Sequence, residues 1–203
     1  MPPTAVFFDM DGVLLDSFEA WLAVMNAAAV EFGCPQITRE AARDAFGQST
    51  QADAELFYPE HTAGDVDEFY MAHFHEYAAL AVATPGASSL LDDLDARGIS
   101  TAVITNTRSE IARPLLEALN LIPHALIASD DVKNPKPAPD MIFRGCEVLG
   151  LSPWDVLVVG DSKFDQQAAA AAGSSFAGFG GIGGNFTVAE ITDVWSILDG
   201  TYI

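Results

Sequence analysis

Two carboxylates near the start of the chain, Asp9 and Asp11, have the residue type and the spacing of a reactive centre. They follow the short apolar run Ala5–Phe8, which we expect to be a strand buried on both faces. Side chains two positions apart in an extended chain project to the same side, and Gly12 releases the chain behind them. Because adjacent carboxylates repel each other unless a cation neutralises them, the pair predicts a site for Mg²⁺, which prefers oxygen ligands. A polar turn behind a strand is the alternative.

Further polar groups follow later apolar runs or lie in the loops between them: Thr105, Asn106, Lys136, Asp161 and Asp165. Neighbouring prolines should hold Lys136 in a stiff loop. In an open parallel sheet, ligands bind beyond the carboxyl ends of the strands, where these groups would meet. Carboxylates, a hydroxyl, an amide and a fixed cation suit phosphoryl transfer, because cations neutralise the developing charge and the hydroxyl orients the phosphate oxygens.

The elements that must position these groups divide into two kinds. Residues 17–80 show helical patterns only, with helices expected at 17–32, 38–46, 51–57 and 66–80, where Ser17 and Thr38 are candidate N-caps. After Thr84–Gly86, strands are expected at 101–104, 125–128, 156–159 and 175–179, alternating with helices at 87–97, 109–119, 139–149, 164–172 and 188–198. This alternation predicts an α/β fold with a Rossmann-like, doubly wound parallel sheet. We expect a core made of residues 1–15 and 84–203, with an inserted helical domain at 16–83.

The charge balance argues against several classes of partner. The chain has 29 acidic and 9 basic residues, a formal charge of −20, and no basic patch for nucleic acid or anionic membranes. It shows no membrane-length apolar run and no signal peptide. Two distant cysteines, Cys34 and Cys146, indicate free thiols in a reducing cytoplasm. We therefore expect a cytoplasmic monomer or homodimer that binds a small molecule, and its acidic surface would suit a cytoplasm of high salt.

In order and separation, these residues resemble the four motifs of the haloacid dehalogenase superfamily, in the branch of phosphoglycolate phosphatase-like and β-phosphoglucomutase-like proteins with a helical cap. The segment 9–17 (DMDGVLLDS) is similar to the first motif, Thr105-Asn106 to the second, Lys136 to the third and 160–165 (GDSKFD) to the fourth. The resemblance spans nearly the whole chain. It implies a Mg²⁺-dependent phosphatase for a small phosphorylated metabolite, with phosphoglycolate or a sugar phosphate ahead of pyrophosphate or a nucleoside monophosphate.

The resemblance also implies catalytic roles. Asp9 would be the nucleophile that forms an aspartyl-phosphate, and Asp11 would protonate the leaving alcohol and then deprotonate the attacking water. Thr105 and Lys136 would bind the transferring phosphoryl group, and Asn106 would bind the substrate. The dehalogenases of the superfamily lack the second acid, so Asp11 favours phosphate esters over carbon–halogen bonds.

For the metal, the resemblance implies that Mg²⁺ is bound by the Asp9 carboxylate, the Asp11 backbone carbonyl and Asp161, with Asp165 in support. For the substrate, Arg43 and Gly47 match the spacing of a loop that faces the site in phosphoglycolate phosphatase-like members. Arg43 would clamp a substrate carboxylate or a second phosphate, or would simply be a surface arginine.

Three other classes of protein, and one glycine-rich motif, compete with this interpretation. A phosphomutase is disfavoured because Trp21 stands where β-phosphoglucomutase-like relatives tend to carry a histidine. A non-catalytic phosphate-binding regulatory protein is the second alternative, because the same fold does not guarantee catalysis. A response-regulator receiver does not fit the helical insertion or the order of the acids. The segment 178–183 matches GxGxxG, but only 20 residues follow it, too few for a dinucleotide-binding unit. We interpret Gly178–Gly184 as a loop bordering the site. Arg108 would face either the crevice or solvent, and we favour solvent.

Overall fold

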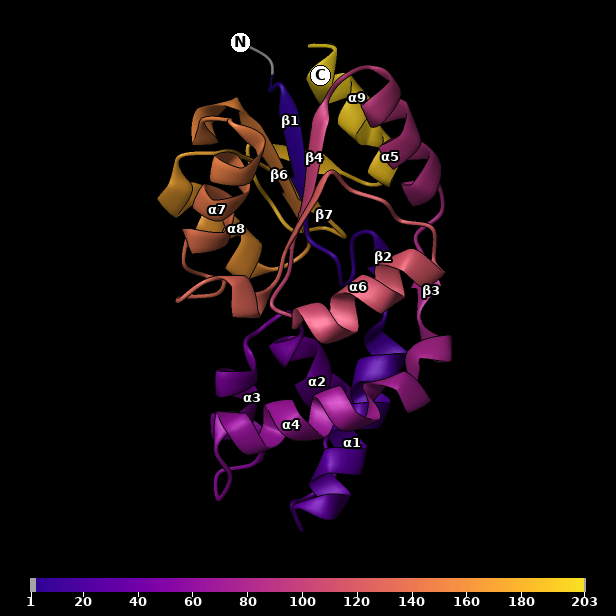
Figure 1. The fold of residues 1–203 in the computed structure, drawn as a ribbon, viewed down its shortest axis with the longest axis vertical. Coiled ribbons are helices and arrows are strands. Elements are labelled where there is room, and N and C mark those ends of the chain that lie inside the picture. Colours follow the sequence, from indigo (N-terminus) through magenta and orange to yellow (C-terminus); the bar gives the residue numbers. More distant parts are fainter. Residues whose placement is uncertain (1–2, 203) are drawn as a thin grey trace.

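The run Ala5–Phe8 forms β1, an inner strand of a six-stranded parallel sheet with the order β5-β4-β1-β6-β7-β8. This sheet is seen in a computed structural model that describes residues 3–202 (Figure 1). The other strands of the sheet are β4 (Ser100–Ile104), β5 (Ala125–Ile127), β6 (Val156–Gly160), β7 (Ser175–Phe179) and β8 (Phe186–Val188). The predicted α/β fold with a parallel sheet is confirmed.

Helices cover both faces of the sheet, which explains why β1 is apolar at every position. Val6 and Phe8 pack in one core with residues of α5 (Ala87–Ala96) and α9 (Val194–Leu198), whereas Phe7 packs in a second core with residues of α7 (Asp140–Leu149) and α8 (Lys163–Ala172). These two pairs of helices lie on opposite faces of the sheet (Figure 1). Successive strand residues point to opposite faces, so a strand between two helical layers must be apolar throughout. The helices that follow the insertion are α5 (Ala87–Ala96), α6 (Ser109–Ala118), α7 (Asp140–Leu149), α8 (Lys163–Ala172) and α9 (Val194–Leu198).

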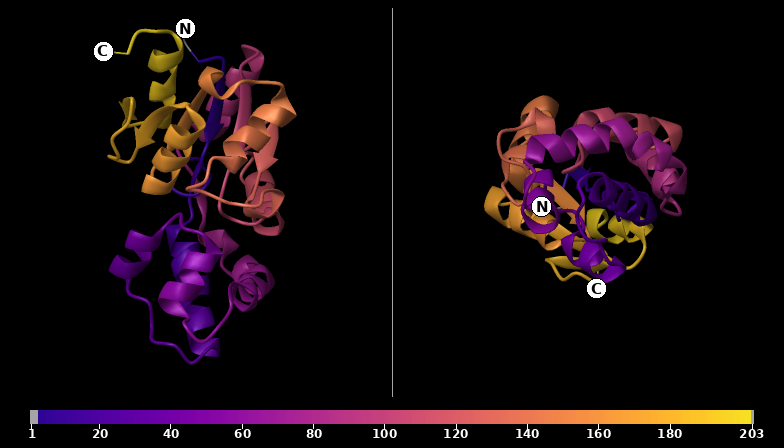
Figure 2. Two further views of the ribbon diagram at one scale, coloured as in Figure 1. Left: turned by 90° about the vertical axis from the view of Figure 1, so that its left-hand side faces the viewer. Right: turned by 90° about the horizontal axis from the view of Figure 1, so that it is seen from below.

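Residues 18–80, here called the helical unit, lie together beyond one end of the sheet (Figures 1 and 2). The unit contains α1 (Phe18–Glu31), α2 (Arg39–Ala45), α3 (Thr50–Phe57), α4 (Ala63–His73) and two 3₁₀ turns at Phe74–Glu76 and Ala78–Leu80. The chain enters it through β2 (Leu15–Asp16) and leaves through β3 (Val82–Ala83), which pair antiparallel. This two-stranded connection places the whole unit over the strand ends that carry the polar residues.

Two helix predictions were wrong at their ends. The helix expected at 66–80 begins at Ala63, because Thr62 and Asp65 form a capping box, and it stops at His73 before the 3₁₀ turns. The helix expected at 188–198 begins only at Val194. The residues before it form β8, whose Phe186 pairs with Ala177 of β7, and a 3₁₀ turn. A three-residue strand is too short to show a period in sequence.

The two candidate N-caps behave differently. The Thr38 hydroxyl accepts a hydrogen bond from Ala41 N at 3.2 Å, as predicted. The Ser17 side chain makes no cap at α1; instead the Asp16 carboxylate accepts a hydrogen bond from Phe18 N at 3.2 Å. The Ser17 hydroxyl is thereby available for a contact at the candidate site.

Cys34 and Cys146 are free thiols, as expected. Across residues 3–202, no helix combines the length and the apolar character needed to cross a bilayer.

Candidate active site

The carboxyl ends of β1, β4 and β6 lie side by side because β1 pairs with both neighbours in register. Phe8 is opposite Val103 on one side and Val159 on the other. The next residues beyond these strand ends are the acids, the hydroxyl and the amide singled out in the sequence: Asp9, Asp11, Thr105, Asn106 and Asp161. The sheet thus gathers residues from three separate parts of the sequence at one edge.

Lys136 lies at the centre of this group and is almost fully buried. Its Nζ donates hydrogen bonds to Asp9 Oδ1 and Asp165 Oδ1, both at 2.7 Å, and to the Ile104 carbonyl oxygen at 2.9 Å. Asn106 holds the lysine loop: its side-chain oxygen accepts from Lys136 N at 2.9 Å, and its Nδ2 donates to Lys136 O at 3.0 Å. The Asn106 amide is therefore occupied by backbone in this structure, and it positions the lysine.

Negative charge is in excess around that lysine. Burial and the nearby Asp165 carboxylate raise the pKa of Asp9 well above its ordinary value, although Lys136 opposes the shift. Burial and Asp165 likewise raise the pKa of Asp161 to about 7. Burial alone would lower the pKa of Lys136, but Asp165 and Asp9 outweigh it and raise that pKa. The single positive charge of Lys136 does not neutralise the negative charge of these carboxylates, so the site favours a further cation.

Carboxylate oxygens of Asp9, Asp161 and Asp165 lie within 4.8 Å of one another, close enough to share a metal ion. Asp161 Oδ1 is buried and lacks a hydrogen-bond partner among the described residues. Asp165 is committed elsewhere, because its second oxygen accepts from Ser162 N at 3.2 Å and from the Ser162 hydroxyl. An unpartnered buried carboxylate oxygen beside another carboxylate fits a hard divalent cation.

Gly12 allows the close approach that this arrangement requires. Its φ is +86°, and a Cβ at this position would lie 2.0 Å from Asp161 Oδ2. No other residue fits between the first motif and the Asp161 carboxylate without moving one of them.

Asp11 is held by donors from both the sheet and the helical unit. Its Oδ1 accepts from the Ser17 hydroxyl and, at 3.0 Å, from Trp21 Nε1; its Oδ2 accepts from Thr107 Oγ1 at 2.8 Å and Thr105 Oγ1 at 3.4 Å. Trp21 and Thr107 were not predicted as site residues. Their spacing contained a signal: Trp21 is one helical turn after Ser17, and Thr107 is two residues after Thr105.

A cavity of about 50 Å³ lies between the strand ends and the helical unit. The core contributes Asp9, Asp11 and the segment 105–107 to its wall. The helical unit contributes apolar and aromatic side chains together with Gln48, Thr50 and Asp53. Asp53 was not predicted, because its neighbours in the sequence give it no distinguishing pattern.

Of the three predicted substrate-binding positions, Asn106 and Gly47 line this cavity, and Arg43 does not. The Gly47 carbonyl oxygen accepts a hydrogen bond from Asn106 Nδ2 at 2.9 Å, which joins the helical unit to the core. The Arg43 side chain is exposed and lies with its guanidinium carbon 4.3 Å from the centre of the Phe18 ring. It borders a separate groove that also includes Asp161 and Lys163.

The prediction that Arg108 faces solvent was wrong. Its side chain is 29% exposed, and its Nη1 lies 3.6 Å from Asp67 Oδ2 on α4. It thus pairs the start of α6 with the helical unit.

The glycine-rich segment 178–184 does not form a dinucleotide-binding turn. Gly178 lies in β7 and pairs with Gly160, and the chain then turns into β8 without an intervening helix. Phe179 and Ile182 border the groove beside Asp161, so the segment lies next to the candidate metal site.

Comparison with known proteins agrees with this geometry. Residues 6–179 match the sequence model of the haloacid dehalogenase-like hydrolases. The chain is 31% identical over 177 residues to an N-acetylmuramic acid 6-phosphate phosphatase of Pseudomonas putida, covering 84% of this chain and 79% of that protein. It is 33% identical to a phosphoglycolate phosphatase of Xylella fastidiosa, over 84% and 77% of the two chains. A hydrolase from Pseudomonas syringae has the same fold, with a TM-score of 0.86, 24% identity and full coverage of both chains. The chain belongs to the haloacid dehalogenase-like hydrolase family.

Proposed function

We propose that this protein is a Mg²⁺-dependent phosphatase that hydrolyses a small phosphorylated metabolite through an aspartyl-phosphate on Asp9. The observation that supports it most is the pair Asp9 and Asp11 beside the buried ammonium of Lys136. Two carboxylates allow one to act as nucleophile and the other as acid and base. The names of the two curated relatives, both phosphatases of small phosphorylated molecules, support the same class.

In the first step, a carboxylate oxygen of Asp9 attacks phosphorus. Asp9 Oδ1 already accepts hydrogen bonds from Met10 N and Lys136 Nζ, both at 2.7 Å, which leaves Oδ2 as the attacking atom. The bond between phosphorus and the ester oxygen breaks, and Asp11 gives its proton to that oxygen. Lys136 and Thr105 stabilise the charge on the phosphoryl oxygens.

In the second step, Asp11 takes a proton from a water molecule that attacks the phosphorus of the aspartyl-phosphate. The bond to Asp9 breaks, inorganic phosphate leaves, and both carboxylates return to their starting states. The donors Ser17, Trp21 and Thr107 keep the Asp11 carboxylate on the side of the cavity where the leaving oxygen would lie.

For the metal, we propose Mg²⁺ bound by the Asp9 and Asp161 carboxylates and the Asp11 backbone carbonyl, with Asp165 in support. When bound, Mg²⁺ would neutralise the acidic cluster and the phosphoryl oxygens.

The proposal includes the division into a core (1–15 and 84–203) and a cap (16–83). Opening at the β2–β3 connection would admit the substrate, and closure would exclude bulk water. It also includes a cytoplasmic location, a monomer or homodimer, and no partner among nucleic acids or membranes.

The test is release of inorganic phosphate from a generic aryl phosphate, with Mg²⁺ and with a chelator. We expect Mg²⁺-dependent turnover that Asp9→Asn abolishes and that the matched control Asp92→Asn, an exposed position on α5, retains. Turnover that persists in Asp9→Asn or in chelator would refute the proposal.

A further inference from the structure

The proposed hydrolysis leaves one carboxylate of the cavity unexplained. Asp53, in the first turn of α3, lines the same cavity as Asp9 and Asp11 and is partly buried. Its Oδ1 accepts a hydrogen bond from Gln48 Nε2 at 2.7 Å, and its Oδ2 accepts one from Tyr70 OH at 3.3 Å. An ionised carboxylate can accept about four hydrogen bonds, so Asp53 can accept more from a group in the cavity.

The network behind Asp53 fixes its position. Tyr70 OH lies 3.1 Å from Tyr58 OH, and Tyr58 OH donates to the Met25 carbonyl oxygen at 2.9 Å. Tyr58 and Tyr70 are both buried. A side chain held by a buried hydrogen-bonded chain keeps its orientation and can select among ligands.

The rest of this end of the cavity is neutral. Among the described residues that line it, the helical unit contributes no lysine or arginine. Arg108 borders an adjoining pocket with Trp21 and Tyr70, and it is paired with Asp67. The aromatic side chains that line the cavity are Trp21, Phe46 and Tyr70, and the rings of Trp21 and Tyr70 pack edge to face with centres 5.5 Å apart. Such walls suit the C–H faces of a short carbon chain.

From this arrangement we infer that the Asp53 end of the cavity binds the uncharged, hydroxyl-bearing leaving group of a short phosphate ester, with Asp53 accepting a hydrogen bond from a substrate hydroxyl. The inference rests on the proposed phosphatase function and narrows its substrate class. A substrate with a carboxylate in place of that hydroxyl is selected against, because it would place like charges together in a partly buried site.

A hydroxyl fits Asp53 better than an ammonium group does. Burial raises the pKa of Asp53 to about 7, so its proton is only partly lost at neutral pH. A hydroxyl can donate to the ionised carboxylate or accept from the protonated one, whereas an ammonium group is bound only by the ionised form.

The test compares the binding of two ligands that differ in one group. Glycerol 3-phosphate and 3-phosphoglycerate share the phosphate and the middle hydroxyl, and differ in a terminal hydroxymethyl or carboxylate. Dissociation constants are measured by calorimetry with Mg²⁺ in the full-length Asp9→Asn protein, so that no turnover is needed. We expect glycerol 3-phosphate to bind at least about tenfold more tightly, and more tightly than O-phosphoethanolamine.

Two further substitutions in the Asp9→Asn protein test whether Asp53 causes the preference for glycerol 3-phosphate over 3-phosphoglycerate. Asp53→Asn should reduce the ratio of the two dissociation constants to within about threefold, because the repelling charge is gone. Glu55→Gln, an exposed position on the same helix, should leave the ratio unchanged. The wild-type ratio is informative even if Asp53→Asn fails to fold.

Several results would overturn the inference: equal or tighter binding of 3-phosphoglycerate, tighter binding of O-phosphoethanolamine, no binding of any of the three, or a ratio that Asp53→Asn does not alter. If Arg43→Ala removes a preference for 3-phosphoglycerate, the arginine is the selecting group. The proposed function fails separately: a protein that shows the expected binding order but hydrolyses no phosphate ester keeps the binding site and loses the phosphatase assignment.

Discussion

At the scale of single residues, the environment of Asp11 is the feature that the proposed chemistry depends on. The same carboxylate must first give a proton and then take one, and four donors hold it at the cavity wall. One of them, Trp21, comes from α1 of the helical unit. The position of the acid therefore depends on how the helical unit sits against the sheet.

Trp21→Phe keeps an aromatic ring but removes the Nε1 donor. Loss of one hydrogen bond to a charged group costs about 1.5 kcal/mol, so kcat for an alkyl phosphate should fall about tenfold. The control is Trp154→Phe, because Trp154 is 73% exposed and precedes β6, at the end of that strand opposite the site. Steady-state kinetics with both variants measure this change. Equal kcat values for Trp21→Phe and wild type would show that the Trp21 hydrogen bond does not position Asp11 for catalysis.

Asp53 also predicts how stability depends on pH. Burial raises its pKa in the folded protein to about 7, above the ordinary value of 3.8, so the folded state binds a proton that the unfolded state has released. This contribution to the free energy of unfolding is therefore lost as the pH rises from about 4 to about 7. Asparagine does not titrate, so Asp53→Asn lacks this pH dependence. The free energy of unfolding of the variant, relative to that of wild type, should therefore rise by about 1–2 kcal/mol between about pH 5 and about pH 8. Urea unfolding at the two pH values measures the difference, and a gain that does not change with pH would contradict the assignment.

Three of the residues that could be predicted from the sequence share one property. Asp9, Thr105 and Asp161 each follow an apolar strand, and parallel pairing brings strand ends together. Trp21 and Asp53 lie on helices whose orientation over the sheet is set by packing at the β2–β3 connection. No period or spacing reports that orientation, so these two emerged only from the structure.

At the scale of elements, close packing of α7 against the sheet gives a further prediction. A Cβ at Gly145 would lie 2.6 Å from Cε2 of Phe7, whose side chain is fully buried. Gly145→Ala should therefore lower the free energy of unfolding by about 1–3 kcal/mol, although alanine favours helix. In the matched control Gly64→Ala, on α4, the added Cβ would lie 3.6 Å from its nearest neighbour, Thr62 Oγ1. The free energy of unfolding of this variant should stay the same or rise. Denaturant unfolding of both variants provides the comparison; a stable Gly145→Ala protein would contradict the packing.

The element boundaries show the same limit of local sequence information. The strands β1, β4, β6 and β7 could be located because each contains a short, mainly apolar segment. Strand β8 could not, because Phe186–Val188 is defined by its pairing with β7. Its Val188 falls at helical spacing with the residues of α9, which extended the predicted helix too far.

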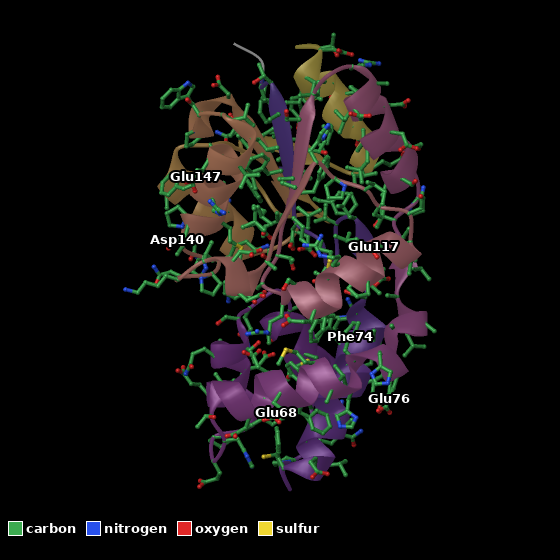
Figure 3. The ribbon with its side chains drawn as sticks, in the orientation of Figure 1. Glu68, Phe74, Glu76, Glu117, Asp140 and Glu147 are labelled. Carbon is green, nitrogen blue, oxygen red and sulfur yellow. The ribbon has the colours of Figure 1, made fainter. Side chains whose placement is uncertain are left out.

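At the scale of the whole molecule, the formal charge of −20 is the dominant feature. Exposed acids such as Glu68, Glu76, Glu117 and Glu147 are spread over helices of both the core and the helical unit (Figure 3). Their mutual repulsion acts against the compact state and is screened by salt. The melting temperature should rise between about 0.02 M and about 1 M KCl, most steeply at the low end, where the Debye length shortens most. An unchanged melting temperature across this series would contradict the expectation.

A phosphorylated Asp9 can be detected in the first turnover of Asp11→Asn with p-nitrophenyl phosphate and Mg²⁺. This leaving group departs with little help from an acid, so Asp9 should still be phosphorylated, but the attack of water needs the missing base. We expect a rapid release of about one nitrophenolate per active site followed by near arrest, and no release from Asp9→Asn. Nitrophenolate release from Asp11→Asn that is linear from the start, or turnover that survives in Asp9→Asn, would contradict a phosphorylated Asp9.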